Sequence, residues 1–394
     1  MYNSRYSHKN LRYSYHFFMK IALVHDQLSE FGGSERVLVV LKEIFPNADV
    51  FTLVYNPEKL GPHKEIIKKW KIKTSWFDKI PILRHFYSPF RFLTPFIWES
   101  FNFSKYDLVI SSSGSWMSKG IKTKKPTIHI SYVHHPPRYL YGYETAIEWK
   151  KYLPVRIYAY IVNHFLRIWD FYSSQRPDYL IANSKETQLR IKRFYHRDSV
   201  VIYPPVNIPK TLHVTRYTLH NYYITVSRLA KAKHIDILIK AANKMGFNLK
   251  IIGTGRDEKY LCSIAGPTVE FLGNLPDNQF EKIFINAKAF LFASRDEEFG
   301  IACLEAMGYG LPVIAYNSGG VPEYVKDKVN GFLFNELNPL SLVEKIKEFE
   351  KLDKKQLLKI KKQARKTAEN FTEANFKKNL LSFLKKTVPY ARIT

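Results

Sequence analysis

The chain has 394 residues, a net charge of +26 and 45% hydrophobic residues. This composition excludes an intrinsically disordered chain, and the length favours two packed domains. Both halves of the chain carry an excess of lysine and arginine, which favours anionic partners such as phosphorylated ligands, nucleic acid or a membrane surface.

The cysteines and the first residues narrow the class of protein further. Cys262 and Cys303 lie far apart and form no C-x-x-C motif, so we expect two small core residues in a reducing cytosol. No uninterrupted apolar segment has the length of a transmembrane helix. Residues 1–18 are basic and tyrosine-rich without the apolar stretch of a signal peptide. We interpret them as an extension, either disordered or an artefact of start-site choice.

Segments with the patterns of strands and helices alternate along the chain, beginning with a strand at residues 20–25 and a helix from about Ser34. Further strands of this first series are expected at residues 106–111, 127–133, 179–182 and 200–202. A second series is expected at residues 222–226, 248–252, 269–272, 289–292, 313–315 and 331–334. Such alternation predicts two parallel sheets, each covered by helices on both faces.

The prolines of residues 203–210 cannot continue a helix or a central strand, so we interpret this segment as the connection between two domains. The expected domains are therefore residues 19–205 and residues 206–371. A C-terminal helix is expected at residues 372–394, because apolar side chains recur there at near-helical spacing and Thr372 is suited to cap the helix.

The most informative segment is residues 293–310, in which Glu297 and Glu305 stand eight positions apart. Apolar residues 289–293 predict a buried strand and residues 301–307 a helix, so Glu297 ends the strand and Glu305 lies about two turns into the helix. Ligands of open α/β sheets bind at this edge, where a helix N-terminus offers free N–H groups. Carboxylates cannot bind phosphate but accept hydrogen bonds from sugar hydroxyls, which indicates a sugar nucleotide.

This segment resembles the retaining family 4 glycosyltransferases of the GT-B fold, whose signature is an acid, seven residues and a second acid. The match includes Phe299 and Gly300 after the first acid and the Gly-Gly of residues 318–323. It makes the alternative, two solvated surface glutamates, the weaker interpretation. Glu298 departs from the pattern, because the family often has glycine there, and it is a candidate for altering the choice of donor.

The resemblance implies two Rossmann-like parallel-sheet domains that face each other across a cleft, with a C-terminal helix that crosses back to the N-terminal domain. The N-terminal domain would bind the acceptor and the C-terminal domain the nucleotide sugar. By the same resemblance, Glu305 would bind the ribose of the nucleotide. Glu297 and the backbone of Phe299, Gly300 and Ile301 would bind hydroxyls of the sugar.

Arg228 and Lys233 follow the strand expected at residues 222–226. A guanidinium can bind two phosphate oxygens, and an ammonium adds a point charge. Two basic residues in a basic chain are ordinarily solvated, but these two match the family's Arg-Leu-x-x-x-x-Lys pattern. The resemblance therefore implies that they stabilise the diphosphate as it departs.

Two glycine pairs lie in loops that follow strands. Gly32 and Gly33 precede the first helix, and Gly253 and Gly255 follow the strand expected at residues 248–252. Glycine lets the backbone approach a ligand closely, although a tight turn would also explain either pair. Position 258 is glutamate, so the third glycine of a dinucleotide fingerprint is absent. The resemblance places the first loop opposite the donor diphosphate and the second beside the nucleotide.

Residues 132–140 resemble the Tyr-x-His-x-Pro-x-Arg block of mannosyltransferases that build O-antigen polysaccharides. The match implies that His134 faces the donor sugar and that Arg138 lines the cleft, although an isolated histidine is more often structural. It favours mannose as the hexose and GDP-mannose as the donor, with a UDP-sugar as the alternative. Ser184 lies in another family-like block, residues 181–187, and we expect it to cap a helix.

No Asp-x-Asp and no Cys/His cluster with metal-ligand spacing occurs, so neither a metal nor a resident cofactor is expected. Residues 70–98 combine lysine and arginine with large aromatic residues, and residues 151–169 repeat this composition. Partly buried helices with basic outer faces are one explanation. The other is a surface that contacts anionic lipid, which would suit a lipid-linked acceptor and a peripheral position on the cytoplasmic face of the membrane.

The sequence thus predicts a retaining, metal-independent glycosyltransferase that moves a hexose from a nucleotide sugar to a glycan or lipid-linked hydroxyl in polysaccharide or glycoconjugate synthesis. The catalytic residues implied by the resemblance are Arg228, Lys233, Glu297 and His134. Two alternatives stay open: a nucleotide-sugar epimerase of the same fold, and a nucleic-acid-binding protein, which the charge of +26 favours. No recognised nucleic-acid module is present, so no specific nucleic-acid partner is expected.

Overall fold

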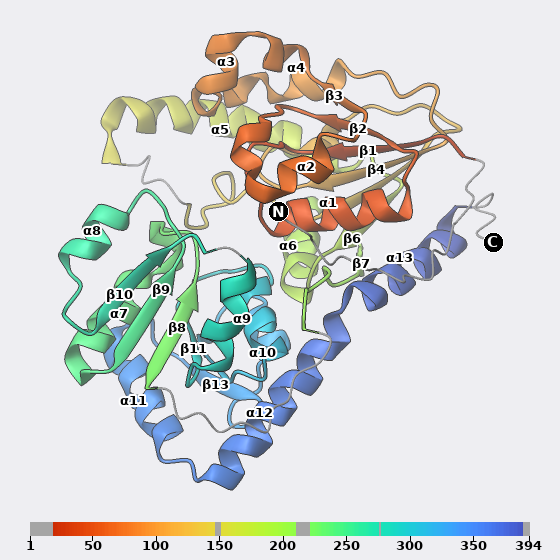
Figure 1. Ribbon diagram of the computed structural model, residues 1–394. Helices are drawn as coiled ribbons and strands as arrows, with labels where there is room; N and C mark the ends of the chain where they lie inside the picture. Colours follow the sequence, from red (N-terminus) through yellow and green to blue (C-terminus); the bar gives the residue numbers. More distant parts are fainter. Residues whose placement is uncertain (1–18, 146–150, 210–220, 276, 389–394) are drawn as a thin grey trace, which may run out of the picture.

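The computed structural model describes residues 19–145, 151–209, 221–275 and 277–388. Two parallel sheets, each flanked by helices, lie one above the other (Figure 1). We call the part with the seven-stranded sheet the N-terminal domain and the part with the six-stranded sheet the C-terminal domain. The expected extension at residues 1–18 and the last residues of the expected C-terminal helix lie outside the described residues.

The seven-stranded sheet has the order β3-β2-β1-β4-β5-β6-β7. Its strands are β1 (Ile21–His25), β2 (Asp49–Thr52), β3 (Ile72–Thr74), β4 (Leu108–Ser113), β5 (Ile128–Val133), β6 (Tyr179–Ala182) and β7 (Val200–Val201). The central strands β1 and β4 are buried along their whole length, as expected of a parallel sheet covered on both faces. The sequence did not indicate β2 and β3, because both are short and carry polar or charged residues.

The helices and 3-10 turns of the N-terminal domain follow its strands in chain order: α1 (Gly33–Ile44), η1 (Pro57–His63), α2 (Lys64–Ile67), η2 (Trp76–Lys79), α3 (Pro81–His85), η3 (Ser88–Leu93), α4 (Thr94–Glu99), η4 (Ser118–Gly120), α5 (Leu153–Ser174) and α6 (Lys185–Tyr195). The predicted cap is confirmed: the Ser184 hydroxyl accepts a hydrogen bond from the Thr187 N–H over 3.0 Å at the start of α6.

The six-stranded sheet has the order β10-β9-β8-β11-β12-β13. Its strands are β8 (Tyr222–Val226), β9 (Asn248–Ile252), β10 (Val269–Gly273), β11 (Phe290–Phe292), β12 (Val313–Tyr316) and β13 (Gly331–Phe334). Its helices and 3-10 turns are η6 (Lys231–Lys233), α7 (Ile235–Met245), α8 (Glu258–Ser263), α9 (Asp277–Ile285), α10 (Ile301–Gly308), η7 (Val321–Glu323), α11 (Pro339–Glu350), α12 (Lys354–Ala368) and η8 (Glu369–Phe371). All six strands lie within two residues of their predicted positions.

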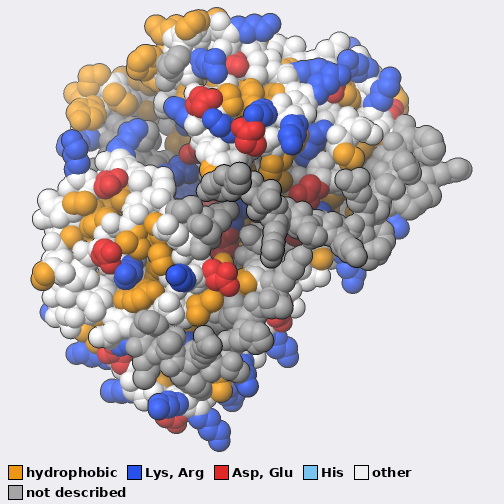
Figure 2. Space-filling view, viewed as in Figure 1, with side chains coloured by type: hydrophobic (Ala, Val, Ile, Leu, Met, Phe, Trp, Pro, Cys, Tyr) orange, Lys and Arg blue, Asp and Glu red, His pale blue; other side chains and the backbone are white. Residues whose placement is uncertain are grey.

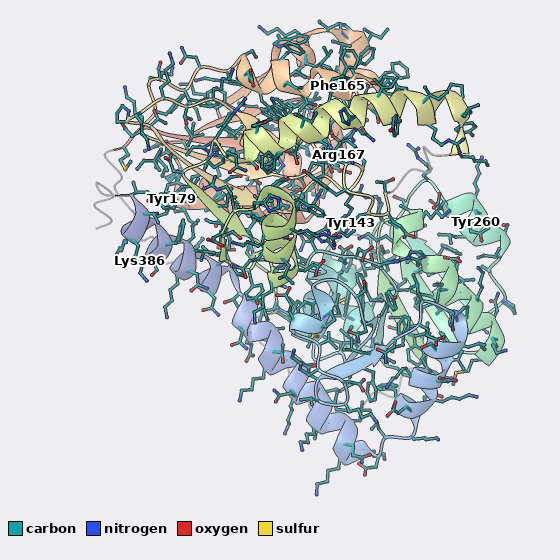
Figure 3. All side chains as sticks on the ribbon, turned by 180° about the vertical axis from the view of Figure 1, so that it is seen from behind. Tyr143, Phe165, Arg167, Tyr179, Tyr260 and Lys386 are labelled. Carbon is teal, nitrogen blue, oxygen red and sulfur yellow. The ribbon has the colours of Figure 1, made fainter. Side chains whose placement is uncertain are left out.

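The last helix, α13 (Glu373–Thr387), returns to the N-terminal domain, as Figure 1 shows along its lower right edge. Thr372 caps it, accepting from the Asn375 N–H, as predicted. Phe376, Leu380 and Leu384 belong to the same core as β1 and α1, and the Tyr179 ring at the start of β6 lies 6.0 Å from the Phe383 ring (Figure 3). The predicted crossing of the C-terminal helix is therefore confirmed.

The prediction of two core cysteines is half wrong. Cys303 is fully buried in α10, but Cys262 is exposed. Cys262 lies on α8, a six-residue helix at the surface of the C-terminal domain, which buries only Leu261. A helix this short covers the sheet with one side chain and leaves its neighbours in solvent.

Candidate functional site

The N-termini of two helices from different domains meet between the sheets. α1 follows β1 and begins after Gly32, and α10 follows β11 and begins after Gly300. A Cβ built on Gly33 would lie 2.9 Å from Cδ1 of Ile301. Because both strands end at the edge where parallel sheets bind ligands, the chain brings two sets of free N–H groups to one place. Gly32, Gly33, Gly300 and Ile301, predicted separately as donor-binding residues, come together here.

The loop of residues 318–320 shapes the backbone that precedes α10. A Cβ on Gly319 would lie 2.1 Å from the Glu297 carbonyl oxygen, and Gly319 has φ +63°. The Gly320 N–H donates to that same carbonyl over 2.8 Å, and the Asp296 N–H donates to the Ser318 hydroxyl over 3.1 Å. Only glycine permits this approach, so the Gly-Gly pair positions Glu297.

Glu297 is the centre of a small buried cluster of charges. Its Oε2 accepts from Nζ of Lys233 over 2.6 Å and from the Ser294 hydroxyl over 3.0 Å. Arg138 of the N-terminal domain lies 3.5 Å from the same oxygen. Burial alone would raise the pKa of Glu297, but the charges of Lys233 and Arg138 outweigh it and lower the pKa. The carboxylate is therefore ionised, and Lys233 is held against it.

The sequence predicted Glu305 about two turns into the helix. In the structure it is the fifth residue of α10, just beyond the first turn. Its carboxylate pairs with Arg36 of α1, across the domain boundary. The Glu305 side chain is 22% exposed, so a ligand can reach it. No sequence pattern singles out Arg36, which simply follows the Gly-Gly-Ser-Glu of the first loop.

Arg228 and Lys233 both border the cleft, but each has a different partner. Arg228 lies 3.2 Å from Glu30 of the N-terminal domain, and its side chain is 56% exposed. Gly253 and Gly255 pack against the loop that carries Arg228. A Cβ on Gly253 would lie 2.0 Å from the Ser227 carbonyl oxygen, and a Cβ on Gly255 would lie 2.2 Å from the Leu229 carbonyl oxygen. These glycines thus have a clear packing role beside the nucleotide-binding role that the resemblance implies.

Glu298 joins the two domains through two arginines. It accepts from Nε and Nη2 of Arg138 over 2.7 and 2.6 Å and from Nη1 of Arg190 over 3.1 Å. Both arginines also donate to the Asp296 carbonyl, over 3.1 and 2.9 Å. Burial would raise the pKa of Glu298, yet Arg138, His135 and Arg190 hold it far below its ordinary value. Arg138 thus contacts the other domain, and the extra carboxylate has partners in the protein.

Arg190 and Glu323 were not indicated by the sequence. Arg190 lies on α6, in a basic stretch, and its guanidinium sits 4.1 Å from the ring centroid of Tyr143, which lies between α5 and the C-terminal domain (Figure 3). The Glu323 carboxylate of η7 accepts from the N–H groups of Lys185 and Glu186 over 2.9 and 2.8 Å. An acid of the C-terminal domain thus caps α6 of the N-terminal domain. Its negative charge lies at the positive end of the helix dipole, which is a favourable interaction.

His134 directly follows β5 and is buried. Its Nε2 lies 2.8 Å from the Ser112 hydroxyl. Burial, together with the nearby His25 and His135, lowers the pKa of His134 well below its ordinary value, so the imidazole is neutral. Nδ1 of the neighbouring His135 lies 3.0 Å from the Pro136 carbonyl oxygen. Glu298 influences the pKa of His134, which places this histidine near the interdomain cluster.

The arrangement can bind an anion between two helix N-termini and hydroxyl groups on two carboxylates. Within the described ranges, no group of three or more His, Cys, Asp or Glu side chains is arranged to hold a metal ion. The predicted cations Arg228 and Lys233 and the predicted acids Glu297 and Glu305 all lie at the boundary between the domains, and His134 lies directly after β5.

Solved structures share this two-domain arrangement. A crystal structure of Anabaena Alr3699/HepE in complex with UDP superposes with a TM-score of 0.67 at 19% sequence identity, covering 93% of this chain and 100% of that one. The fold is GT-B. It consists of two Rossmann-like domains with parallel sheets and a C-terminal helix, α13, that packs on the N-terminal domain.

Sequence comparison agrees with the fold. Residues 215–367 match the family model described as "Glycosyl transferases group 1". The GtfA subunit of a UDP-N-acetylglucosamine–peptide N-acetylglucosaminyltransferase from Streptococcus pneumoniae is 27% identical over 77% of this chain and 58% of its own length. The human alpha-1,3/1,6-mannosyltransferase ALG2 is 26% identical over 45% of this chain and 51% of its own length. The chain spans about half the length of these curated relatives.

Proposed function

We propose that the protein is a retaining, metal-independent glycosyltransferase that moves a hexose from a nucleotide sugar to a glycan or lipid-linked hydroxyl. The observation that carries this proposal is the meeting of the α1 and α10 N-termini beside Glu297, Lys233 and Glu305. A diphosphate is the ligand that such paired N-termini favour, because their N–H groups and partial positive charges converge on one anion. The carboxylates next to it suit the hydroxyls of ribose and hexose.

In this proposal the donor replaces contacts that the protein now makes with itself. The ribose takes the place of Arg36 on Glu305, and sugar hydroxyls donate to Glu297 beside the backbone of Phe299 and Gly300. Lys233, released from Glu297, and Arg228, released from Glu30, then bind the diphosphate oxygens. Lys233 and Arg228 thereby exchange one anion for another, and Glu297 and Glu305 exchange a cation for hydroxyl donors. Each of these charged groups keeps a hydrogen-bonding partner, which limits the cost of binding.

The proposed reaction takes place on one face of the sugar. The bond from C1 to the phosphate oxygen breaks with its electron pair on the phosphate, and the acceptor oxygen bonds to C1 from the same side. The proton of the acceptor hydroxyl passes to the departing phosphate oxygen. Arg228 and Lys233 stabilise the charge that develops on the diphosphate, so no separate general base is required.

The nucleotide and sugar belong to the proposal as well. The histidine block at residues 132–140 and the likeness to a mannosyltransferase favour GDP-mannose. The HepE crystal structure is a complex with UDP, which makes a UDP-sugar the alternative. Thermal unfolding in the presence of GDP, UDP and their hexose conjugates separates the two, because the cognate nucleotide alone should raise the melting temperature at micromolar concentration.

The acceptor is proposed to bind on the N-terminal domain. An open hollow of about 510 Å³ is lined by Tyr141, His164, Arg167, Ile168, Phe171, Tyr172 and Phe194. Its rings can pack against sugar faces, and the rings of Tyr141 and Phe194 are themselves stacked at 4.1 Å. Tyr141 follows Arg138 by three residues, so one wall of the hollow is close in sequence to the domain boundary.

An anionic membrane surface is the proposed location of the acceptor. Of 23 exposed large hydrophobic residues in the described part of the chain, 17 lie in residues 66–96 and 152–172. The two segments adjoin, because the Tyr158 hydroxyl donates to the Pro89 carbonyl and the Trp169 indole to Glu99. Figure 2 shows apolar side chains gathered over α3 and the start of α5. No helix among the described residues is long and apolar enough to span a bilayer.

The structure changes which basic residues of this surface are available to lipid. Lys73 donates to Asp49 and Tyr106, Arg84 to the Tyr55 carbonyl, and Arg91 lies over the rings of Trp116 and Tyr139. Phe77 and Trp98, grouped with the aromatic surface by the sequence, are fully buried. The exposed basic residues next to exposed apolar ones include Lys79, Lys151 and Arg156. We propose a peripheral position on the cytoplasmic face through this surface.

A transfer assay tests the proposal as a whole. Purified protein is incubated with radiolabelled GDP-mannose or UDP-hexoses and a lipid-linked oligosaccharide extract, with and without EDTA. We expect an acceptor-dependent product, with the anomeric configuration of the donor, in both conditions. A nucleotide-sugar product without acceptor would indicate an epimerase instead. Activity lost in EDTA and restored by magnesium or manganese would overturn metal independence.

A further inference from the structure

Behind the α1 N-terminus lies a chain of buried polar side chains that the proposed reaction does not use. Glu35 Oε1 lies 3.1 Å from Nε2 of His25, and Nδ1 of His25 lies 3.0 Å from the Ser112 hydroxyl. The same hydroxyl lies 2.8 Å from Nε2 of His134. All four side chains are buried, with between 1% and 8% of each residue exposed. Glu35 lies in α1, His25 in β1 and Ser112 in β4, and His134 directly follows β5.

The Glu35 carboxylate is fixed at the far end of this chain. Its second oxygen, Oε2, accepts from the Gly32 N–H over 2.8 Å and lies 3.0 Å from the Ser34 hydroxyl. Burial would raise the pKa of Glu35, but the hydrogen bonds from His25 and Ser34 outweigh it and lower the pKa. An ionised carboxylate has no proton to donate. Nε2 of His25 must therefore carry the hydrogen of their shared bond.

The rest of the order follows from the inventory of donors and acceptors. In a neutral His25 with Nε2–H, Nδ1 is an acceptor, so the Ser112 O–H donates to it. The Ser112 oxygen then accepts, and the hydrogen between Ser112 and His134 belongs to Nε2 of His134. What remains is Nδ1 of His134, without a hydrogen and without a hydrogen bond to any described residue.

We infer that Glu35, His25 and Ser112 act as positioning residues that fix His134 as the Nε2–H tautomer and present its bare Nδ1 as a hydrogen-bond acceptor at the cleft. The natural partner of such an acceptor is a hydroxyl group of the bound sugar. This identification of the partner rests on the proposed function, whereas the tautomer does not. An imidazole whose tautomer is preset needs no reorganisation when substrate arrives.

The tautomer is measured directly by nitrogen NMR of protein labelled with ¹⁵N-histidine, between pH 7 and 8. The His134 signals are assigned by their loss in His134→Gln. We expect a protonated Nε2 and an unprotonated Nδ1 in the wild type. A proton on Nδ1 of His134 in the wild type would overturn the inference.

Glu35→Gln tests the direction of the chain. The Gly32 N–H and the Ser34 hydroxyl hold the oxygen of the introduced amide, so its NH₂ faces His25 and forces Nε2 to accept. Every hydrogen bond beyond it then reverses, and we expect His134 to carry its hydrogen on Nδ1. Ser112→Ala interrupts the chain and should give a mixture of both tautomers. Wild-type tautomers in both variants would show that the chain does not set His134.

Ser111→Ala is the matched control. Ser111 lies on the same strand, is equally buried and makes the same kind of contact, 2.9 Å from Nε2 of His129, but it has no link to the chain. It should leave the His134 signals unchanged. A shift of His134 in this control equal to that in Ser112→Ala would reduce the effect to general loss of packing.

Kinetics provide a second readout that depends on substrate. We expect Glu35→Gln and Ser112→Ala to lower turnover about tenfold, the loss of one well-placed hydrogen bond, with donor affinity within about twofold. Ser111→Ala should stay within about twofold of the wild type. If the wild type transfers no sugar at all, the proposed function fails while the NMR result stands. If transfer occurs and the NMR result is negative, only the positioning chain fails.

Discussion

The carboxylates beside the α1 and α10 N-termini are compensated in different ways. At α1, Glu35 finds its partners in its own domain, Gly32, Ser34 and His25. At α10, the carboxylates of Glu298 and Glu305 are neutralised by Arg138, Arg190 and Arg36, all from the other domain. One side of the site is complete as soon as its domain folds, and the other is complete only when the domains dock.

This difference between contacts within one domain and contacts across two domains indicates which side of the site can rearrange when a ligand binds. The hydrogen bonds around Glu35 are buried and uncharged apart from one carboxylate, so opening the cleft does not disturb them. The arginine contacts of Glu298 and Glu305 must break whenever the domains separate. We therefore expect the C-terminal side to respond to donor, pH and domain position, while the N-terminal side serves as a fixed reference.

The largest effect is expected from removing Glu298. Glu298→Gln leaves Arg138 and Arg190 without their carboxylate, which should lower the free energy of unfolding by about 3 kcal/mol at pH 7. Its pKa is lower in the folded protein, so its contribution is present above the unfolded pKa of about 4.3 and is lost as pH falls below it.

Urea unfolding between pH 7 and about pH 2.5 measures this contribution. The gap in stability between wild type and Glu298→Gln should stay constant down to roughly pH 5 and narrow below it, because the unfolded carboxyl takes up its proton at about pH 4.3 and the folded one only at much lower pH. Glu344→Gln, on the exposed face of α11, is the control and should unfold like the wild type. A gap that is independent of pH would show that Glu298 contributes by packing and not by charge.

The next effect concerns the two cations of the C-terminal side. Lys233→Ala and Arg228→Ala should each reduce turnover by roughly 10²–10³ without unfolding the protein, because each removes a charge aimed at the departing diphosphate. Lys240→Ala, which removes a lysine paired with Asp236 on the surface of α7, is the control. Turnover of either site variant within a few-fold of the wild type would refute its assigned role.

A smaller effect is expected for the ribose contact. Glu305→Ala should weaken donor binding by about 1.5–3 kcal/mol in calorimetry, since hydroxyl hydrogen bonds to a charged acceptor are lost. Arg36→Ala sharpens the comparison, because the donor is proposed to displace Arg36 from Glu305. It should leave donor affinity equal or tighter. Equal weakening in both variants would show that Arg36 itself binds donor.

The smallest effect per residue lies outside the cleft. Lys79→Gln, Lys151→Gln and Arg156→Gln combined should reduce sedimentation with anionic vesicles at low salt, each residue contributing about 1 kcal/mol that salt screens. The control removes the same charge from the region of α11 and α12 through Lys347→Gln, Lys351→Gln and Lys355→Gln, which change three exposed residues. Equal binding of the two triple variants would show that only net charge matters, and the acceptor would then be sought among soluble glycans.

The sequence was sufficient wherever a local pattern dictates the structure. Buried apolar runs such as residues 290–292 and the glycine after Phe299 identified β11, α10 and the acids beside them. It was insufficient where partners are distant: Arg36 and Glu305 are 269 residues apart, and Arg190 and Glu298 are 108 apart. Such pairs depend on how two domains dock, and no spacing along one helix or strand encodes that. The sequence likewise did not indicate that Glu298 pairs with Arg138 and Arg190, because both arginines are distant in the chain.

The chain passes between the domains twice, and both passages run together. The Val206 N–H donates to the Phe371 carbonyl over 2.9 Å, so the outgoing and returning segments are bonded to each other. The rings of Tyr203 and Phe371 lie 5.4 and 5.6 Å from that of Phe299, which directly precedes the first turn of α10. The two crossings thus form one connection between the domains, and it packs against Phe299, the residue after Glu298. A rotation of one domain against the other about this connection would therefore also move the acids that we propose to bind the sugar.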